Sequence, residues 1–371
     1  MSLFICLNKD VKLALAMSFE QNQFDTIQVK PLKPLIKWAG GKTRLNPQLL
    51  KVSDIALKSL KIEKFDYYEP FFGGGALFFE LYKNEKIENA YINDIIPHLI
   101  SFYKTVANSE WLNELFERIE ELEDEFNKGN KSEIYGSAKE NTGWVGKFNK
   151  LWMITDSESS EKTIKDKLET KEENIESAAL LYVLNKTGFN GMFRLSQKGK
   201  FNIPKGDTDK IRFKDEPDKN KKENHVSIKN YFKNASSILI KTSIHCGSFE
   251  KILPPENKID KDKSFIYLDP PYVPDSETAD FTDYSKEGFG EDDHKKVASI
   301  FHKLSEDGYK VVLSNNSNTV SKSMYAKNKN VFAYEVEVTR SIAKTKKGKR
   351  PPSKELLVSS FDLDELGLKK V

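Results

Sequence analysis

Four consecutive residues, Asp269-Pro-Pro-Tyr272, carry the groups needed to activate the exocyclic amine of a nucleobase. Such a nitrogen shares its lone pair with the ring and is a poor nucleophile. Asp269 and the Pro270 carbonyl can each accept one of its hydrogens, which frees the lone pair for attack on an electrophile. Pro270 and Pro271 contribute no N–H and stiffen the backbone, and Tyr272 offers an aromatic face for stacking. The alternative is a proline-rich turn after a buried strand.

A second segment predicts a nucleoside ligand. Glu69-Pro-Phe-Phe-Gly-Gly-Gly75 joins an aromatic-rich strand pattern to a helical one, and its glycines let backbone approach a ligand closely. Asp94 ends the next strand pattern, 21 residues after Gly73. This is about the spacing at which an acid accepts hydrogen bonds from ribose hydroxyls. Ala76-Leu77 follows in place of a phosphate-loop lysine, so a nucleoside triphosphate is disfavoured. The alternative for the glycines is a tight turn.

The elements that position these segments alternate between strand and helix patterns. Apolar runs at 65–69, 89–94, 264–268 and 309–314 predict strands, and 110–127 carries the apolar stripe of a helix. Residues 178–194 begin helical and end in glycine-bearing chain, and 204–224 are polar and predict a loop. We therefore expect an α/β fold that is interrupted by a second, less regular module.

Composition excludes several classes of protein. Lys and Arg total 59 against 56 acids, so the net charge of +3 is too small for a general polycation. Two cysteines and five histidines without ligand spacing predict no metal site. No apolar run reaches the roughly 18 residues of a membrane span, so we expect a cytoplasmic protein. The patterned chain begins near Pro31, and Met17 is an alternative start.

Five segments, in order, resemble the Dam-type DNA adenine-N6 methyltransferases, which have the D12-class order of motifs. The resemblance extends from about Pro34 to Leu357. The segments are Leu35-Ile-Lys-Trp-Ala-Gly-Gly-Lys42, the glycine segment, Ile92-Asn-Asp94, Asn185-Lys-Thr-Gly-Phe-Asn-Gly-Met-Phe-Arg194 with Gly199-Lys-Phe-Asn-Ile-Pro-Lys-Gly206, and Asp269-Pro-Pro-Tyr272.

The resemblance implies S-adenosylmethionine as cofactor and methyl transfer to adenine N6, with Asp269, Pro270, Pro271 and Tyr272 as the catalytic motif. Trp38 can pack against a sulfonium group, and Lys42 can pair with the methionine carboxylate. The residues carried over to the cofactor site are Trp38, Lys42, Glu69, Phe71, Gly73, Asp94 and Asp269.

For DNA, the resemblance implies that Arg194 reads guanine, which a bidentate Arg does in the major groove, and that Phe189 inserts near the flipped base. Lys186-Thr187 departs from the Arg-Tyr of some members, so GATC is expected only as the leading target. A basic stretch at 340–354 fits phosphate contact, and the loop Phe281-Thr-Asp-Tyr284 fits closure over the base. The expected DNA-binding residues are Phe189, Asn190, Arg194, Lys198, Lys200, Lys346 and Lys347.

The resemblance thus predicts a Rossmann-like methyltransferase domain at 31–108 and 236–371, an inserted, mostly helical target-recognition domain at 109–235, and an extension at 1–30. The expected partner is double-stranded DNA, bound by a monomer; a cognate restriction endonuclease is a further candidate. Three alternatives stay open. They are an amino-methyltransferase acting on cytosine N4, RNA or a protein amide, a DNA-binding protein without catalysis, and a restriction nuclease.

Overall fold

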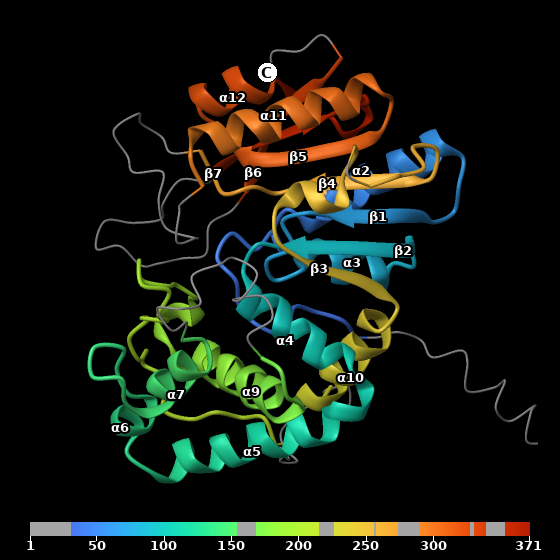
Figure 1. Ribbon diagram of the computed structural model, residues 1–371. Coiled ribbons are helices and arrows are strands. Elements are labelled where there is room, and N and C mark those ends of the chain that lie inside the picture. The colour runs from blue at the N-terminus through green and yellow to red at the C-terminus, as the bar shows by residue number, and fades with distance from the viewer. Residues whose placement is uncertain are drawn as a thin grey trace, which may run out of the picture.

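An eight-stranded sheet forms the centre of the molecule, in the order β3-β2-β1-β4-β5-β7-β6-β8 (Figure 1). The computed structural model describes residues 31–153, 168–214, 226–255, 257–273, 289–326, 330–338 and 353–371. The strands are β1 (Phe65–Glu69), β2 (Ile87–Asp94), β3 (Thr242–Cys246), β4 (Ser264–Leu268), β5 (Lys310–Asn316), β6 (Phe332–Val338), β7 (Ser353–Ser359) and β8 (Lys369–Lys370).

The direction of the strands decides where functional side chains gather. Strands β3, β2, β1, β4 and β5 are parallel, so their carboxyl ends share one edge of the sheet. Strand β7 pairs antiparallel with both β5 and β6, and β8 adds to β6. In open α/β sheets the crevice outside the carboxyl ends is the usual place for a ligand.

Alternate residues along each strand serve two separate cores. Phe65 and Tyr67 of β1 join the core that contains α2 (Asn46–Leu60), α3 (Ala76–Lys83) and α4 (Pro97–Ala107). Tyr68 belongs to the core on the other face, which contains α11 (Glu291–Glu306) and α12 (Thr319–Tyr325). Both faces of the parallel strands are therefore buried under helices, as βαβ connections require.

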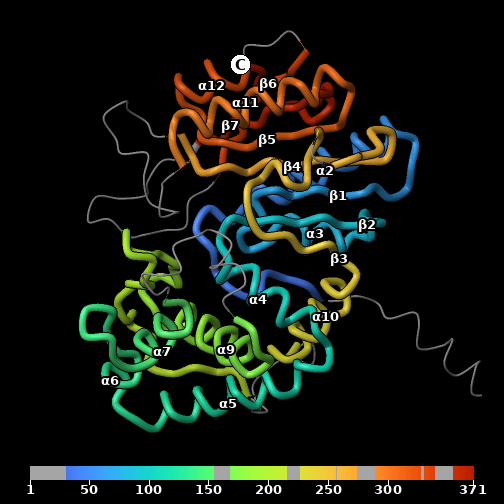
Figure 2. The backbone as a smooth tube through the Cα atoms, in the orientation of Figure 1, coloured from blue at the N-terminus to red at the C-terminus, as the bar shows by residue number. Residues whose placement is uncertain are grey.

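A helical layer lies beyond α4 (Figure 2). It contains α5 (Leu112–Lys128), α6 (Lys131–Tyr135), α7 (Gly143–Leu151), α9 (Lys171–Thr187) and α10 (Ile228–Leu239). The central helix is α9, which packs against α4, α5 and α7. Its residues from Ser177 to Asn185 are all buried, so it is apolar around its circumference rather than along one stripe. The core of this layer is continuous with that under the sheet.

The expected α/β fold is confirmed, and the four predicted strands are present. The helix predicted at 110–127 begins with a short 3-10 turn, Ser109–Trp111, because the Asn108 side chain caps that turn; α5 follows from Leu112. Trp144 and Trp152, which stand in a polar stretch of sequence, are both buried in the helical layer. Among the described residues, no helix combines the length and apolarity needed to cross a bilayer.

Candidate active site

The carboxyl edge of the sheet brings three acidic side chains together. Glu69 ends β1, Asp94 ends β2, and Asp269 follows β4, the neighbour of β1 on its other side. Glu69 and Asp94 are buried, and Asp269 is 16% exposed. The sequence had placed the last two at strand ends; the strand order now makes all three neighbours.

Asp269 is held by contacts that converge on one of its oxygens. The Lys42 ammonium lies 2.6 Å from Oδ1, and the Ser314 hydroxyl donates to the same atom at 2.9 Å. Ser314 lies in turn 2.7 Å from the Tyr267 hydroxyl. Burial raises the pKa of Asp269, while Lys42 and Ser314 act in the opposite direction. The Lys42 side chain, expected to meet a cofactor carboxylate, thus meets Asp269 here.

The loop after Asp269 is fixed by the end of β5. The Asn315 side chain accepts from the backbone N–H of Val273 at 3.0 Å, and Asn316 donates to the Val273 carbonyl at 2.7 Å. Tyr272 is 37% exposed, its hydroxyl donates to Glu355 on β7, and Lys42 lies 4.5 Å from its ring centroid. The aromatic face next to Asp269 is therefore presented at the surface by a firmly held backbone.

The glycine segment is bound to the end of β2. Gly73 has φ of +52°, and its N–H donates to Asp94 Oδ2 at 2.9 Å. The other oxygen of Asp94 accepts from Ile96 N–H at 3.0 Å. A Cβ on Gly73 would lie 2.9 Å from Cδ1 of Trp38, so the indole covers this turn closely. Phe71 instead packs its ring against Phe249 and Phe289 on the other face of the sheet.

Burial has a clear effect on the acids of this edge. It raises the pKa of Asp94 to about 6, although the N–H groups of Ile96 and Gly73 lower it. It also raises the pKa of Glu69 well above its ordinary value, with the charges of Asp269 and Asp94 adding to the effect. Within the part of the chain that the structure describes, Glu69 Oε2 is buried without a hydrogen-bond partner.

S-adenosylmethionine fits this chemistry. Three acids against the one ammonium of Lys42 leave the pocket short of positive charge, and buried carboxylates that lack cations are costly. The cofactor carries a sulfonium and an α-ammonium group, and it has ribose hydroxyls that a carboxylate can accept from. Ile95, which directly follows Asp94 and is 51% exposed, adds an aliphatic surface suited to a planar base.

The expected DNA-reading segment forms a short hairpin. Leu195 pairs antiparallel with Phe201 across a turn at Gly199, where φ is +71°. Arg194 stands at its base, and its Nε donates to the Asn202 side chain at 2.9 Å. Neither Nη group of Arg194 hydrogen-bonds to a described residue, and the side chain is half-buried. Lys198 is exposed at the turn and Lys200 is half-buried.

The hairpin and the sheet edge lie on one side of the molecule, where the arrowheads of β1 and β2 and the chain after α9 are seen in Figure 1. The Trp38 ring stacks on Phe193 with centroids 5.3 Å apart. Phe189 is 49% exposed beside Asn190, whose φ is +55°. Lys346, Lys347 and the loop 281–284 lie outside the described residues.

Three contributors to this region were not assigned a role from the sequence. Ser314, Asn315 and Asn185 are ordinary residues whose roles come from partners far away in the chain. Only the position of Ser314 and Asn315 at the end of a predicted strand could have indicated the first two.

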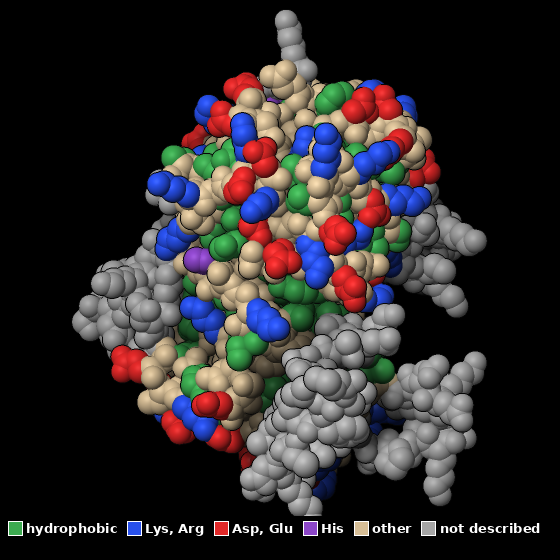
Figure 3. Space-filling model, turned by 90° about the vertical axis from the view of Figure 1, so that its right-hand side faces the viewer, with side chains coloured by type: hydrophobic (Ala, Val, Ile, Leu, Met, Phe, Trp, Pro, Cys, Tyr) green, Lys and Arg blue, Asp and Glu red, His purple; other side chains and the backbone are tan. Residues whose placement is uncertain are grey.

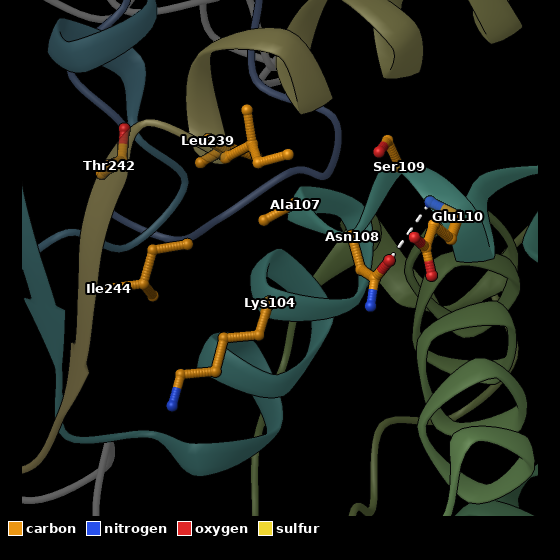
Figure 4. Close-up of a pocket in the computed structure, with 9 residues that line it drawn as sticks. Lys104, Ala107, Asn108, Ser109, Glu110, Leu239, Thr242 and Ile244 are labelled. Carbon is orange, nitrogen blue, oxygen red and sulfur yellow. Dashed lines mark hydrogen bonds between the residues drawn. The ribbon is translucent and has the colours of Figure 1, made fainter.

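A hollow in another part of the molecule is lined by none of the predicted site residues. This hollow of about 510 Å³ lies where α4, α10 and the edge strand β3 meet, lined by Lys104, Leu239 and Ile244 among others (Figure 4).

The face in Figure 3 shows acidic and basic side chains interspersed rather than a field of one sign. The described residues contain no group of three or more His, Cys, Asp or Glu able to hold a metal ion.

Comparison with known proteins agrees with the geometry. The type II methyltransferase M.MjaIII of Methanocaldococcus jannaschii is 33% identical over 77% of this chain and 85% of its own. M1.LlaDCHI, a type II methyltransferase of Lactococcus lactis, is 32% identical over 89% and 96%. A DNA adenine methylase of Vibrio cholerae is 28% identical over 80% and 86%. Residues 38–342 match a family model, and the chain therefore belongs to the D12 class of N6 adenine-specific DNA methyltransferases.

Proposed function

We propose that this enzyme transfers a methyl group from S-adenosylmethionine to N6 of an adenine flipped out of duplex DNA. The observation that carries the proposal is the position of Asp269 beside the exposed ring of Tyr272, on the same edge as the Gly73–Asp94 pair. An acceptor for the amine, a stacking face and a nucleoside-type turn meet there. A base that is still paired within the duplex cannot reach Asp269 and Tyr272, so the target nucleotide must rotate out of the DNA stack.

The chain's own residues prepare the amine. Lys42 and Ser314 both contact Oδ1 of Asp269, so we assign Oδ2 and the Pro270 carbonyl to the two N–H groups of adenine. Tyr272 stacks on the ring and fixes its plane. When bound, the cofactor supplies a methyl group on positively charged sulfur. As the amine nitrogen bonds to the methyl carbon, the sulfur–methyl bond would break, its electron pair would stay on sulfur, and neutral S-adenosylhomocysteine would leave. The nitrogen becomes cationic in this step, and Asp269 stabilises that charge and accepts the proton that the nitrogen then loses.

The same edge supplies the contacts for the cofactor. Asp94 accepts from the ribose hydroxyls, Glu69 with its buried unpartnered oxygen accepts from the α-ammonium, and Trp38 packs over the Gly73 turn. The Lys42 ammonium, which contacts Asp269 and the Gly40 carbonyl, has a third N–H for the carboxylate of the amino-acid end. Phe71 contributes through the aromatic packing that supports the glycine segment.

The helical layer at 109–235 acts in this proposal as the target-recognition domain. Arg194 reads a guanine through its guanidinium fork, Phe189 and Asn190 fill the space left by the flipped base, and Lys198 and Lys200 contact phosphates. Lys346 and Lys347 add phosphate contacts. A GATC-like site is the first target to test. The names of the two type II relatives favour a role in restriction-modification over regulatory marking.

The test is made on plasmid DNA from a host without base methylation that expresses this protein. The DNA is digested to nucleosides, and N6-methyladenine and N4-methylcytosine are quantified by mass spectrometry. Abundant N6-methyladenine is expected with the wild type. N4-methylcytosine instead would overturn the choice of base.

Asp269→Asn is the matched variant for this test. This variant keeps the size of the side chain but removes the negative charge that stabilises the developing ammonium. The rate of methyl transfer should therefore fall by about 10²–10⁴-fold. Binding of S-adenosylhomocysteine, measured by calorimetry, verifies that the variant is folded. Near-normal transfer by Asp269→Asn would remove Asp269 from its catalytic role.

A further inference from the structure

Asn185, in the last turn of α9, links two segments that are far apart in the sequence. Its Oδ1 accepts from the backbone N–H of Lys37 at 2.9 Å, and its Nδ2 donates to the Lys37 carbonyl at 2.8 Å. The same Nδ2 donates to the Gly191 carbonyl at 2.8 Å. The side chain is 3% exposed. One buried amide thus binds the segment before Trp38 and the loop before Arg194.

The contact between these segments is too close for a larger residue. Gly191 has φ of +66°, and a Cβ there would lie 2.7 Å from Cδ of Lys37. It would also lie 3.0 Å from the Asn185 carbonyl oxygen, a backbone atom that cannot move aside. The loop therefore packs directly on the Lys37 side chain and on the backbone of α9, and Asn185 supplies the hydrogen bonds that hold it to Lys37.

A second link runs through aromatic rings. Trp38 covers the Gly73 turn on one side and stacks on Phe193 at an interplanar angle of 22° on the other. Phe193 directly precedes Arg194. The turn proposed to receive the cofactor and the side chain proposed to read DNA are thus joined by two routes, the Asn185 amide and the Trp38–Phe193 stack.

We propose that Asn185 is a positioning residue that makes these two segments one mechanical unit, so that cofactor binding and DNA binding strengthen each other. The inference rests on the proposed function. A ligand that orders Trp38 over Gly73 also orders Phe193, and the loop then presents Arg194 with less loss of conformational freedom. By thermodynamic linkage, DNA must strengthen cofactor binding by the same factor.

The test measures that factor directly. The target site is first mapped on the plasmid DNA by sequencing that detects N6-methyladenine. The Kd of a fluorescein-labelled, unmethylated duplex that contains this site is then measured by anisotropy, with and without saturating S-adenosylhomocysteine. We expect a coupling factor of at least about 5 for the wild type, within the usual range for coupled sites. Asn185→Ala should bring it close to one, because the loop then moves independently of Lys37.

Asn127→Ala is the matched control. Asn127 also clamps a backbone with its amide, accepting from the Ile211 N–H at 2.9 Å and donating to its carbonyl at 3.0 Å, away from the reading loop. This variant should keep the wild-type factor. If Asn185→Ala fails to fold, Phe193→Leu provides a second variant, since it removes the stack on Trp38 but keeps an apolar side chain.

The outcomes separate the inference from the proposed function. If Asn185 is purely structural, Asn185→Ala will weaken the binding of DNA and of S-adenosylhomocysteine but leave the coupling factor intact. That result would overturn the inference. A wild-type factor near one, with S-adenosylhomocysteine still bound, would also overturn it and leave the methyl transfer standing. A wild type that does not bind S-adenosylhomocysteine at all would overturn both the inference and the proposed function.

Discussion

At the scale of single residues, the two key carboxylates differ in what surrounds them. Both oxygens of Asp94 accept from backbone N–H groups, whereas the Asp269 contacts come from the side chains of Lys42 and Ser314. Asp94 is therefore part of the scaffold of the glycine turn as well as a candidate ligand. In the proposed function Asp269 keeps Oδ2 for the amine, and its electrostatic balance depends on the Lys42 and Ser314 side chains, which can be changed one at a time.

Ser314→Ala tests the support of Asp269. The change removes a hydrogen bond to a charged group, worth ~1.5–3 kcal/mol, and leaves the buried Tyr267 hydroxyl without that partner. We expect kcat to fall at least about tenfold, with a small change in the KM for cofactor. Because the lost hydrogen bond favoured the charged form, the acidic limb of the pH–rate profile should move to higher pH.

Ser305→Ala is the control for that variant. Ser305 lies in the last turn of α11, and its hydroxyl donates to the Asn330 carbonyl at 2.7 Å. Ser314→Thr should restore the pH profile because it retains the hydroxyl. A Ser314→Ala enzyme with lower kcat but an unmoved profile would point to a general packing defect.

Asp94 predicts a pH dependence of cofactor binding. Its pKa is about 6 in the free protein because burial outweighs the two N–H donors. Ribose hydroxyls that donate to the carboxylate would lower this pKa in the complex, so binding weakens as the pH falls through about 6. The limit is about tenfold for each pH unit.

Calorimetry with S-adenosylhomocysteine between pH 5 and 8 measures this slope. Asp94→Asn should bind more weakly and lose the part of the slope that Asp94 contributes. A wild type and a variant with the same slope would show that Asp94 does not accept from the ligand.

At the scale of elements, prediction succeeded where the information is local. β4 and Asp269 were found because an apolar run ends at an acid, and the hairpin after α9 because its glycines and Arg194 form a recognisable motif. The Lys42–Asp269 pair could not be found in this way, since 227 residues separate its members. Strands β6 to β8 were also missed, because their pairing depends on β7 lying between β5 and β6.

The hairpin that we propose to read DNA predicts a change in base discrimination. Arg194→Lys keeps the charge but loses the fork, so both it and Arg194→Ala should reduce discrimination at one guanine by ~1–3 kcal/mol. The measurement is kcat/KM on duplexes with each base of the site replaced in turn. Arg212→Ala removes an exposed arginine of the same layer and should leave the ratios unchanged. Equal discrimination by wild type and Arg194→Ala would refute the assignment.

At the scale of the whole molecule, the sheet and the helical layer share one core, and His98 lies at their junction. Its ring packs on Trp152 with centroids 4.1 Å apart and also meets Phe148 and Phe193. Burial lowers the pKa of His98 to about 3. The two layers are therefore joined through a histidine that stays neutral in the folded state.

His98 makes stability depend on pH. The unfolded chain takes up a proton near pH 6.5, but the folded protein does so only near 3, so the free energy of unfolding falls as the pH drops below about 6.5. The slope approaches about 1.4 kcal/mol per pH unit. Melting temperatures of the wild type and of His98→Phe at pH 7.5 and 5 test this prediction. The melting temperature of the variant should fall less between the two pH values. An equal fall in both proteins would show that His98 does not cause the pH dependence.

The pairing of β7 with its neighbours has a consequence for the basic stretch of the sequence. Asn316 at the end of β5 pairs with Glu355, and Val338 at the end of β6 pairs with Ser353, so both anchors of residues 339–352 lie at the carboxyl edge of the parallel strands. Six of those fourteen residues are Lys or Arg, and none is acidic. A charge tethered at both ends has a high effective concentration within the reach of its tether. The proposed docking of a duplex at that edge would therefore bring its phosphates within reach of six cations that the net charge of the chain conceals.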